Sequence, residues 1–274
     1  MKKFSAAMTL TLLSAGAQAL TVSYGDFSDL SDFQLNGATA SITNPTADNA
    51  LRLTNNLGQS GSAFLTDAIS LNNQASFSTR FDFRITNPQG ISDGDGQGAD
   101  GIVFVVQTVA NTAGGSGGGI GYQGLANSVG IEFDTWNNGS WDDYDGNHVG
   151  IDLSGNIDSV VQTSVSPRMN NGDVWTAWVD YNGATDLLEV RLSDAGIRSV
   201  SALLSYNVDL ETVLGSPNAF VGFTSGTGAA GGYHDILNFE FRDNFNPVSA
   251  SEPATFALLG LGLLGVFAGQ RRKA

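Results

Sequence analysis

The chain has 274 residues with 12 basic and 27 acidic side chains, a formal net charge of −15 and no cysteine. This acidic balance excludes nucleic acid as a partner, because phosphate binding needs a basic footprint, and it favours cations. Without disulfide bonds the fold depends on burial of a core and on any bound metal.

The chain begins with a predicted secretory signal peptide. Residues 1–19 contain two lysines, an apolar run from Ala6 and the small-residue cleavage signal Ala17-Gln18-Ala19. These features are typical of a segment that is removed on export.

Residues 20–245 are expected to form one all-β domain. Phe77, Phe81 and Phe83 alternate with polar residues, which predicts a half-buried strand, and the β-branched run 100–109 predicts a strand covered on both faces. Further strand patterns occupy 128–136, 174–182, 187–194, 219–226 and 236–243. No amphipathic helical window stands out, so an all-β sandwich or barrel is predicted. The Gly-rich stretch 111–124 is interpreted as a loop within this domain rather than a linker.

The tail predicts a sorting or anchoring segment. After a linker at 246–253, residues 254–274 form a short apolar run that closes on Arg271, Arg272 and Lys273. The run is short for a spanning helix, and the basic end would stay cytoplasmic. The tail resembles a PEP-CTERM sorting signal of Gram-negative bacteria, with Glu252-Pro253 in place of its box. The resemblance implies transient insertion into the inner membrane, removal of the tail, and a cell-surface or extracellular location; the alternative is a permanent anchor.

One segment concentrates acids that no basic side chain on it can neutralise. Only seven of the 12 basic residues lie outside the terminal signals, and none lies within 131–152. That segment holds His148 together with Glu132, Asp134, Asp142, Asp143, Asp145 and Asp152. Glu132 and Asp134 share a strand face, and the following turn can return Asp142 and His148 to it. Because such carboxylates repel one another, a bound cation is predicted: oxygen ligands suit calcium, and an added imidazole suits manganese.

Four motifs in order resemble the legume-type (L-type) lectins: "GADGIVFVV", "GGGIGYQG", "VGIEFDTWNN…NHVGID" and "GFTSGTGAAGGYHDILNFEF". The resemblance implies a concanavalin-like jelly-roll sandwich of two antiparallel sheets and a non-catalytic, metal-dependent lectin. Glycans or exopolysaccharide are the expected partners, and pairing into a homodimer would add avidity.

The same resemblance implies the site residues. Manganese would be held by Glu132, Asp134, Asp142 and His148. Calcium would be held by Asp134, the Trp136 carbonyl, Asn138 and Asp142, with Asp143 as the alternative to Asp142. The implied sugar-binding residues are Asp100, Gly119, Trp136, Asn138, Ala229 and Ala230, with a cis peptide between Ala99 and Asp100. Asp145 is left as a solvated turn acid, Asp152 as a strand-end residue and His234 as a structural histidine.

Two other functions compete with a lectin. A laminarinase-type glycosidase needs E-x-D-x-x-E on one strand, but Asn137 occupies the last position. A calcium-stiffened matrix protein without a sugar site is the second alternative. The stretch "DGDGQG" (93–98) matches half of an EF-hand loop, yet Phe104 stands where a glutamate is needed, so only a weak auxiliary ion site stays open there.

Overall fold

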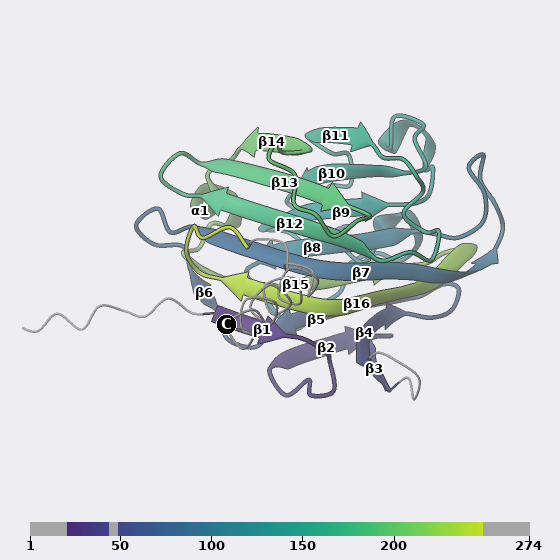
Figure 1. Ribbon diagram of the computed structural model, residues 1–274, viewed down its shortest axis with the longest axis horizontal. Helices are drawn as coiled ribbons and strands as arrows, with labels where there is room; N and C mark the ends of the chain where they lie inside the picture. The colour runs from purple at the N-terminus through teal and green to yellow at the C-terminus, as the bar shows by residue number, and fades with distance from the viewer. Residues whose placement is uncertain (1–20, 44–48, 249–274) are drawn as a thin grey trace, which may run out of the picture.

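The computed structural model describes residues 21–43 and 49–248. Within them the chain forms two antiparallel sheets of eight strands each, packed face to face (Figure 1). The predicted all-β sandwich is confirmed. The predicted signal peptide and sorting tail lie outside the described residues.

The back sheet has the order β14-β13-β12-β7-β16-β4-β3, and β1 pairs with β16. Its strands are β14 (Leu204–Asn207), β13 (Leu187–Ser193), β12 (Trp175–Asn182), β7 (Phe77–Gly90), β16 (Ala230–Arg242), β4 (Asn49–Thr54), β3 (Ala40–Thr43) and β1 (Thr21–Tyr24). The front sheet has the order β11-β10-β9-β8-β15-β5-β2, and β6 pairs with β15. Its strands are β11 (Val161–Ser164), β10 (His148–Leu153), β9 (Ser128–Asp134), β8 (Gly101–Gln107), β15 (Asn218–Gly226), β5 (Ser60–Leu65), β2 (Phe33–Gly37) and β6 (Ile69–Ser70).

The main core lies between the two sheets and is rich in phenylalanine. Phe81 of the back sheet packs edge-on against Phe223 of the front sheet, with ring centroids 4.9 Å apart, and also contacts Phe104 and Phe133. The alternation seen in the sequence therefore points these rings into the sandwich, where removal of apolar surface from water is the main stabilising term.

A second, smaller core covers the outer face of the front sheet. Here Ile120 and Tyr122 from the Gly-rich stretch, with Leu125 just after it, pack over Val103 and Val105 of β8. The strand is thus buried on both faces, as its continuous apolar run predicted. The Gly-rich stretch, which includes the short 3-10 helix η1 (Gly117–Gly119), is a loop of this domain and not a linker.

One element was not foreseen. The helix α1 (Leu210–Leu214) spans five residues, begins after Asp209, whose side chain accepts the Thr212 N–H, and ends at Gly215 in the left-handed region. A single turn is too short to show an amphipathic period. Among the described residues, no helix is long and apolar enough to cross a membrane.

The back sheet uses most of the arginines. Arg191 and Arg198 both contact buried Asp180, and Arg52 binds Asp235 at 2.7 Å with Arg84 also nearby. Other pairs on this sheet are Arg80 with Asp82, Arg191 with Glu189, and Arg242 with Glu240. Of the seven arginines between residues 21 and 248, only Arg168 lies outside this group.

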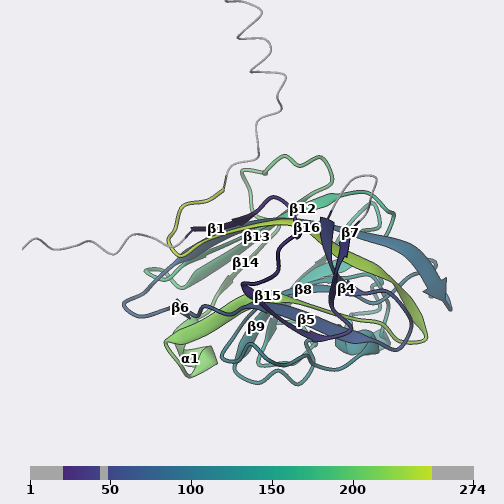
Figure 2. The same cartoon turned by 90° about the horizontal axis from the view of Figure 1, so that it is seen from below.

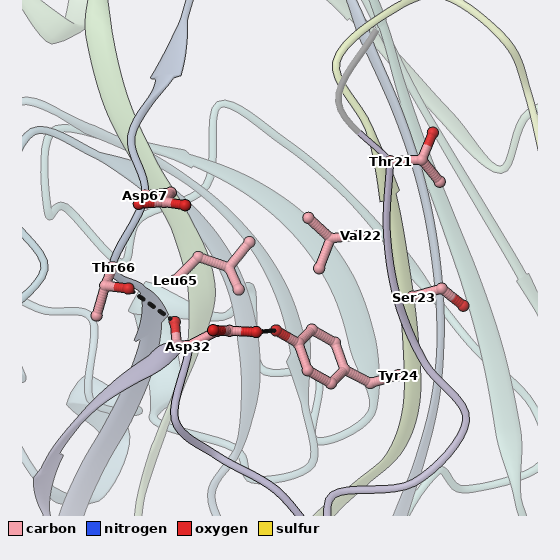
Figure 3. A pocket seen from close by; sticks show the side chains of 8 residues that line it. All are labelled: Thr21, Val22, Ser23, Tyr24, Asp32, Leu65, Thr66 and Asp67. Carbon is pink, nitrogen blue, oxygen red and sulfur yellow. Dashed lines mark hydrogen bonds between the residues drawn. The ribbon is translucent and has the colours of Figure 1, made fainter. Parts of the chain in front are cut away.

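The two ends of β16 mark two ends of the molecule. Its first residues pair with the end of β7, Ala230 opposite Gly90, whereas its last residues pair with β1, Thr21 opposite Arg242 (Figures 1 and 2). A cavity of about 340 Å³ lies at the β1 end. Figure 3 shows Val22 and Leu65 on opposite sides of it, with the Tyr24 hydroxyl donating to Asp32 at 2.8 Å. The acids of segment 131–152 do not line this cavity.

Candidate functional site

A cluster of potential metal ligands lies where β9 and β10 meet. Glu132 and Asp134 project from one face of β9, and His148 opens β10 directly opposite Asp134. All three side chains are buried, and their ligand atoms lie within 4.8 Å of one another. His148 Nε2 is 3.1 Å from Glu132 Oε1. Alternation along β9 and the return of the chain into β10 thus bring these three residues together.

The loop between these strands brings Asp142 to the same place. It runs through the 3-10 helix η2 (Gly139–Trp141), and the Asn138 N–H donates to the Asp142 carboxylate. Asp142 is only 3% exposed, whereas the adjacent Asp143 is exposed and has a φ of 49°. The buried position of Asp142 favours it over Asp143 as a ligand.

The carboxyl groups of the cluster are hard to ionise together. Burial, followed by the charges of Glu132 and Asp142, raises the pKa of Asp134 well above its usual value. Burial also raises the pKa of Asp142 to about 6, although the Asn138 N–H and His148 oppose the shift. For His148 burial lowers the pKa, but the hydrogen bond and charge of Glu132 outweigh it, so the net shift is upward. The cluster therefore needs either protons or a cation.

Asp152 lies at the end of β10, as the sequence suggested, and it is also part of the acid cluster. It lies on the same face of β10 as His148, is fully buried, and shares Ser159 with Glu132. Ser159 Oγ is 2.8 Å from Glu132 Oε1 and 2.7 Å from Asp152 Oδ1. One hydroxyl proton can serve only one of these oxygens. Burial, followed by the charge of Glu132, raises the pKa of Asp152 well above its usual value. Gly150 makes room, because a Cβ there would lie 2.0 Å from Ser159 Oγ.

Asp100 lies just before β8, at the edge of the cluster. It follows a cis peptide bond after Ala99, as the family resemblance implied. Its carbonyl accepts the N–H and the hydroxyl of Thr135, at 2.8 and 3.1 Å. The side chain is buried, and Oδ2 has no hydrogen-bond partner among the described residues. Burial and the charge of Asp142 raise the pKa of Asp100 to about 7, partly offset by the Gly228 N–H.

Asn138 provides a donor to complement this acceptor. Its Nδ2 is buried and has no hydrogen-bond partner within residues 21–43 and 49–248. The side chain lies against Gly118, where a Cβ would approach Asn138 Oδ1 to 2.4 Å. The Gly119 N–H already donates to the Ser116 carbonyl at 3.2 Å. Gly118 and not Gly119 is thus the glycine of this run that adjoins Asn138.

The other amino-acid residues predicted to bind sugar differ in their exposure and in their hydrogen bonds. Trp136 is half-buried, and its N–H donates to Asp134 Oδ1 at 2.7 Å. Ala229 is exposed at the tip of the turn between β15 and β16, and its carbonyl accepts the Ile91 N–H. Ala230 is buried, and its carbonyl accepts the Gly228 N–H. Gly228, which the sequence did not single out, packs close to Gly117 and Asp100.

The stretch that resembles half of an EF-hand loop forms a hairpin, and this hairpin contacts the loop that carries the candidate site. Asp93 Oδ1 accepts the N–H groups of Asp95 and Gly96, and its Oδ2 accepts the Asn137 N–H at 3.1 Å. Arg168 donates to the carbonyls of Asp95 and Thr135. The hairpin is therefore tied to both sides of Trp136. No sequence signal linked Arg168 to this end of the molecule.

Three further residues take roles within the fold. The side chain of Asn137 accepts the Gly139 N–H and donates to the Tyr144 carbonyl, each at 2.7 Å, so it links two parts of the loop. A glycosidase of the type considered above would carry a carboxylate at this position. Asp145 is only partly solvated, since it accepts from Asn147 N and Ser164 Oγ. His234 is buried and bonds Thr54 at 2.7 Å, and burial lowers its pKa to about 3.

Comparisons with known proteins agree with this fold. Residues 19–256 match the model of the legume lectin domain, and residues 249–273 match the PEP-CTERM protein-sorting motif. The basic agglutinin of Psophocarpus tetragonolobus is 34% identical over 197 residues, which are 67% of this chain and 72% of that protein. The L-type lectin-domain containing receptor kinase VIII.1 of Arabidopsis thaliana is 32% identical over 176 residues. The match covers 62% of this chain but only 24% of the kinase.

Solved structures give the same result. The winged bean acidic lectin complexed with methyl-α-D-galactose superposes with a TM-score of 0.70 and 26% identity, covering 84% of this chain and 100% of that one. The basic winged bean lectin with Tn-antigen gives a TM-score of 0.69 and 25% identity, covering 82% and 98%.

The raised pKa of Asp100 predicts how stability depends on pH in the metal-free domain. The folded state holds this proton more tightly than the unfolded chain does, so the contribution is complete below about pH 4 and is lost as pH rises toward 7. Asp100→Asn removes the titration. As pH rises through that window, the unfolding free energy of this variant, measured by denaturant titration, should increase relative to that of the parent by about 1.4 kcal/mol per pH unit.

The control is Asp194→Asn, at an exposed position away from the cluster. It should keep the pH slope of the parent. If the curves of Asp100→Asn and the parent run parallel from pH 4 to 7, the burial of an ionisable Asp100 is contradicted.

Proposed function

The chain belongs to the legume lectin domain family, and from this premise we propose that it is a metal-dependent carbohydrate-binding lectin exported to the surface of a Gram-negative bacterium. Members of this family bind carbohydrate and are not enzymes, which agrees with the expected lack of catalysis. One observation carries the proposal. A buried acceptor without a partner, Asp100 Oδ2, and a buried donor without a partner, Asn138 Nδ2, adjoin the acid cluster. A sugar hydroxyl both donates and accepts, so it can satisfy both atoms.

We propose that two ions occupy the cluster. Glu132, Asp134, Asp142 and His148 fit manganese, since an imidazole joins three carboxylates. Asp134, Asn138, Asp142 and the Trp136 carbonyl fit calcium, which takes oxygen ligands. The raised pKa values of Asp134 and Asp142 support a cation here, because positive charge would let these carboxylates ionise. The bound ions would hold the loop that carries Asn138.

Each sugar-binding residue has a distinct role in this proposal. Asp100 accepts from sugar hydroxyls while Asn138 donates to them. The ring of Trp136 packs against the C–H face of a pyranose. The Gly118 amide makes no hydrogen bond with the described residues, so it is better suited than Gly119 as the backbone donor. Ala229 borders the sugar from the last loop, and Ala230, whose carbonyl is occupied, supports that loop.

The metal proposal predicts a chelator-sensitive fold. Removing the ions should lower the melting temperature, and calcium at a hundred times its dissociation constant should restore about 2.7 kcal/mol of stability, because only the folded state has the site. Asp142→Asn should lose this response in calorimetry, whereas Asp143→Asn should keep it. An identical melting curve with and without calcium, in protein verified as metal-free, would rule out the site; loss of response in Asp143→Asn alone would reassign the ligand.

The sugar proposal predicts separable effects on glycan and metal. On a glycan array, Asp100→Ala should lose binding, since a hydrogen bond to a charged group contributes about 1.5–3 kcal/mol, a factor of roughly ten to 150. Its calcium-dependent melting shift should remain. Asn138→Ala should weaken both responses, and Trp136→Ala the glycan response alone.

Three results would change this conclusion. Equal glycan affinity of Asp100→Ala and the parent would place the sugar site elsewhere. Calcium-dependent stability in a parent that binds no glycan would favour the structural matrix protein. Release of reducing ends from a β-glucan, abolished by Glu132→Gln, would favour the glycosidase.

The terminal segments should be absent from the mature protein. We propose that residues 1–19 are a signal peptide, residues 20–245 the lectin domain, 246–253 a linker and 254–274 a sorting segment that is removed. The match of residues 249–273 to a sorting motif supports removal near Pro253. Intact-mass analysis of surface protein from the native host should show neither end. A mature form that retains Arg271–Lys273 would indicate a permanent anchor.

A further inference from the structure

The strand β1 begins directly after the predicted cleavage point of the signal peptide. Cleavage after Ala19 makes Leu20 the first residue of the exported protein, and Leu20 lies one residue outside the described part of the chain. From Thr21 onward β1 is paired with the end of β16, and Thr21 is opposite Arg242. The new N-terminus is therefore created next to a strand that already belongs to the back sheet.

Alternate side chains of β1 face the cavity of about 340 Å³ at this end of the molecule. Figure 3 shows Val22 and Tyr24 pointing into the cavity, and Thr21 and Ser23 pointing away from it. Val22 and Tyr24 are partly buried and pack against the main core, whereas Thr21 and Ser23 are exposed. Side chains two residues apart share one face of a strand, so the pattern assigns Leu20 to the face of Val22 and Tyr24.

A buried acceptor without a partner follows β16 at the same level. Because Thr21 is opposite Arg242 in the antiparallel register, the residue before Thr21 is expected opposite Asp243. Phe239 and Phe241 of β16 belong to the core, so alternation gives Asp243 the same side of the sheet. Asp243 Oδ1 is buried and has no hydrogen-bond partner within residues 21–43 and 49–248. Buried polar atoms of folded proteins are usually paired, so this oxygen calls for a donor.

The side-chain cations of the domain already have other partners. The neighbouring Arg242 donates to Glu240 at 2.8 Å and to the Asn246 carbonyl at 3.0 Å. The other six arginines between residues 21 and 248 contact acids of the back sheet or, for Arg168, backbone carbonyls. The only lysines of the chain lie in its terminal signals, at Lys2, Lys3 and Lys273. Removal of residues 1–19 adds one further cation to the domain, the α-ammonium group of its first residue.

We propose that the α-ammonium group of Leu20, created by signal-peptide cleavage, binds the carboxylate of Asp243 while the Leu20 side chain packs into the cavity against Val22 and Leu65. Before hydrolysis of the bond to Ala19, the same nitrogen belongs to a neutral amide, which cannot form an ion pair. Cleavage therefore adds a stabilising contact to the fold only after export. The inference concerns a region apart from the candidate metal and sugar site, and it rests on the proposed removal of residues 1–19.

The scarcity of lysine permits a selective chemical test. The protein is exported through its own signal peptide in a host without the sorting enzyme, so the tail stays attached, and intact mass confirms that the chain begins at Leu20. Its primary amines are then the α-amine and Lys273, which serves as the internal reference. With trace acetic anhydride at pH 7, the α-amine of the parent should react about tenfold more slowly, relative to Lys273, than that of Asp243→Asn. The reason is that the carboxylate stabilises the protonated, unreactive amine.

Stability provides a second measurement, in a Lys273→Arg background where only the α-amine can be acetylated. Complete acetylation should raise the unfolding equilibrium constant from denaturant titration about tenfold, and Asp243→Asn should raise it by a similar factor. Acetylation of Asp243→Asn should add nothing further, because both changes remove the same ion pair. The acetylated protein with Asp243 intact reports on the contact even where Asp243→Asn does not fold.

Two matched variants separate this contact from general effects of charge. Asp67→Asn removes an exposed acid that lines the same cavity, and it should leave the acetylation rate and the unfolding constant within about twofold of the parent. Leu20→Ser keeps the ammonium group but loses the apolar side chain, so it should raise the unfolding constant while acetylation of Asp243→Asn stays faster than its own.

Several results would overturn the inference. Equal acetylation rates in the parent and in Asp243→Asn, or additive effects of acetylation and Asp243→Asn on stability, would show that the two groups do not pair. An effect of Asp67→Asn as large as that of Asp243→Asn would replace the specific pair with general charge attraction. An unchanged unfolding constant in Leu20→Ser would show that the cavity is not filled by this side chain. The glycan and calcium responses are measured separately, so the proposed lectin function stands in each of these cases, whereas retention of residues 1–19 after export would refute the proposed processing as well.

Discussion

Buried carboxylates without lysine or arginine partners dominate the end of the front sheet. Glu132, Asp134, Asp142 and Asp152 lie together out of water, where like charges cannot all ionise. Six of the seven arginines between residues 21 and 248 form the ion pairs of the back sheet. The molecule thus separates its charges, with neutralised pairs on one sheet and uncompensated acids at the edge of the other. A bound divalent cation, as proposed above, would resolve this imbalance without any additional side chain.

The two packed sheets hold in place the strands that carry these carboxylates. Because the phenylalanine core and the Gly-rich loop bury the two faces of the front sheet, β8, β9 and β10 form a rigid platform. Small residues let the charged and aromatic side chains approach one another. Gly150 leaves room for Ser159 and Glu132, and Gly130 leaves room for Tyr122 and Val103.

Loops build the candidate binding surface on this platform, and polar contacts hold them in place. The hairpin at Asp93 and the guanidinium of Arg168 hold the chain on both sides of Trp136. Asn137 closes the following loop. Asp100 and Asn138 are thereby held with unpaired polar atoms before a ligand arrives, which reduces the entropy lost on binding.

The sequence by itself determined the sandwich and the pair of acids at the centre of the cluster, because both follow from period-two alternation. It brought Glu132 and Asp134 to one face of a strand and Phe81 into the core. Only the tertiary structure distinguished Asp142, which is buried beside the cluster, from the adjacent Asp143, which is exposed. It also showed that Gly118 adjoins Asn138. Ser159 and Arg168, from later in the chain, contact the cluster and the hairpin at Asp93, and Asp152 lies within the cluster. These depend on contacts between segments far apart in sequence, and no local pattern encodes such contacts.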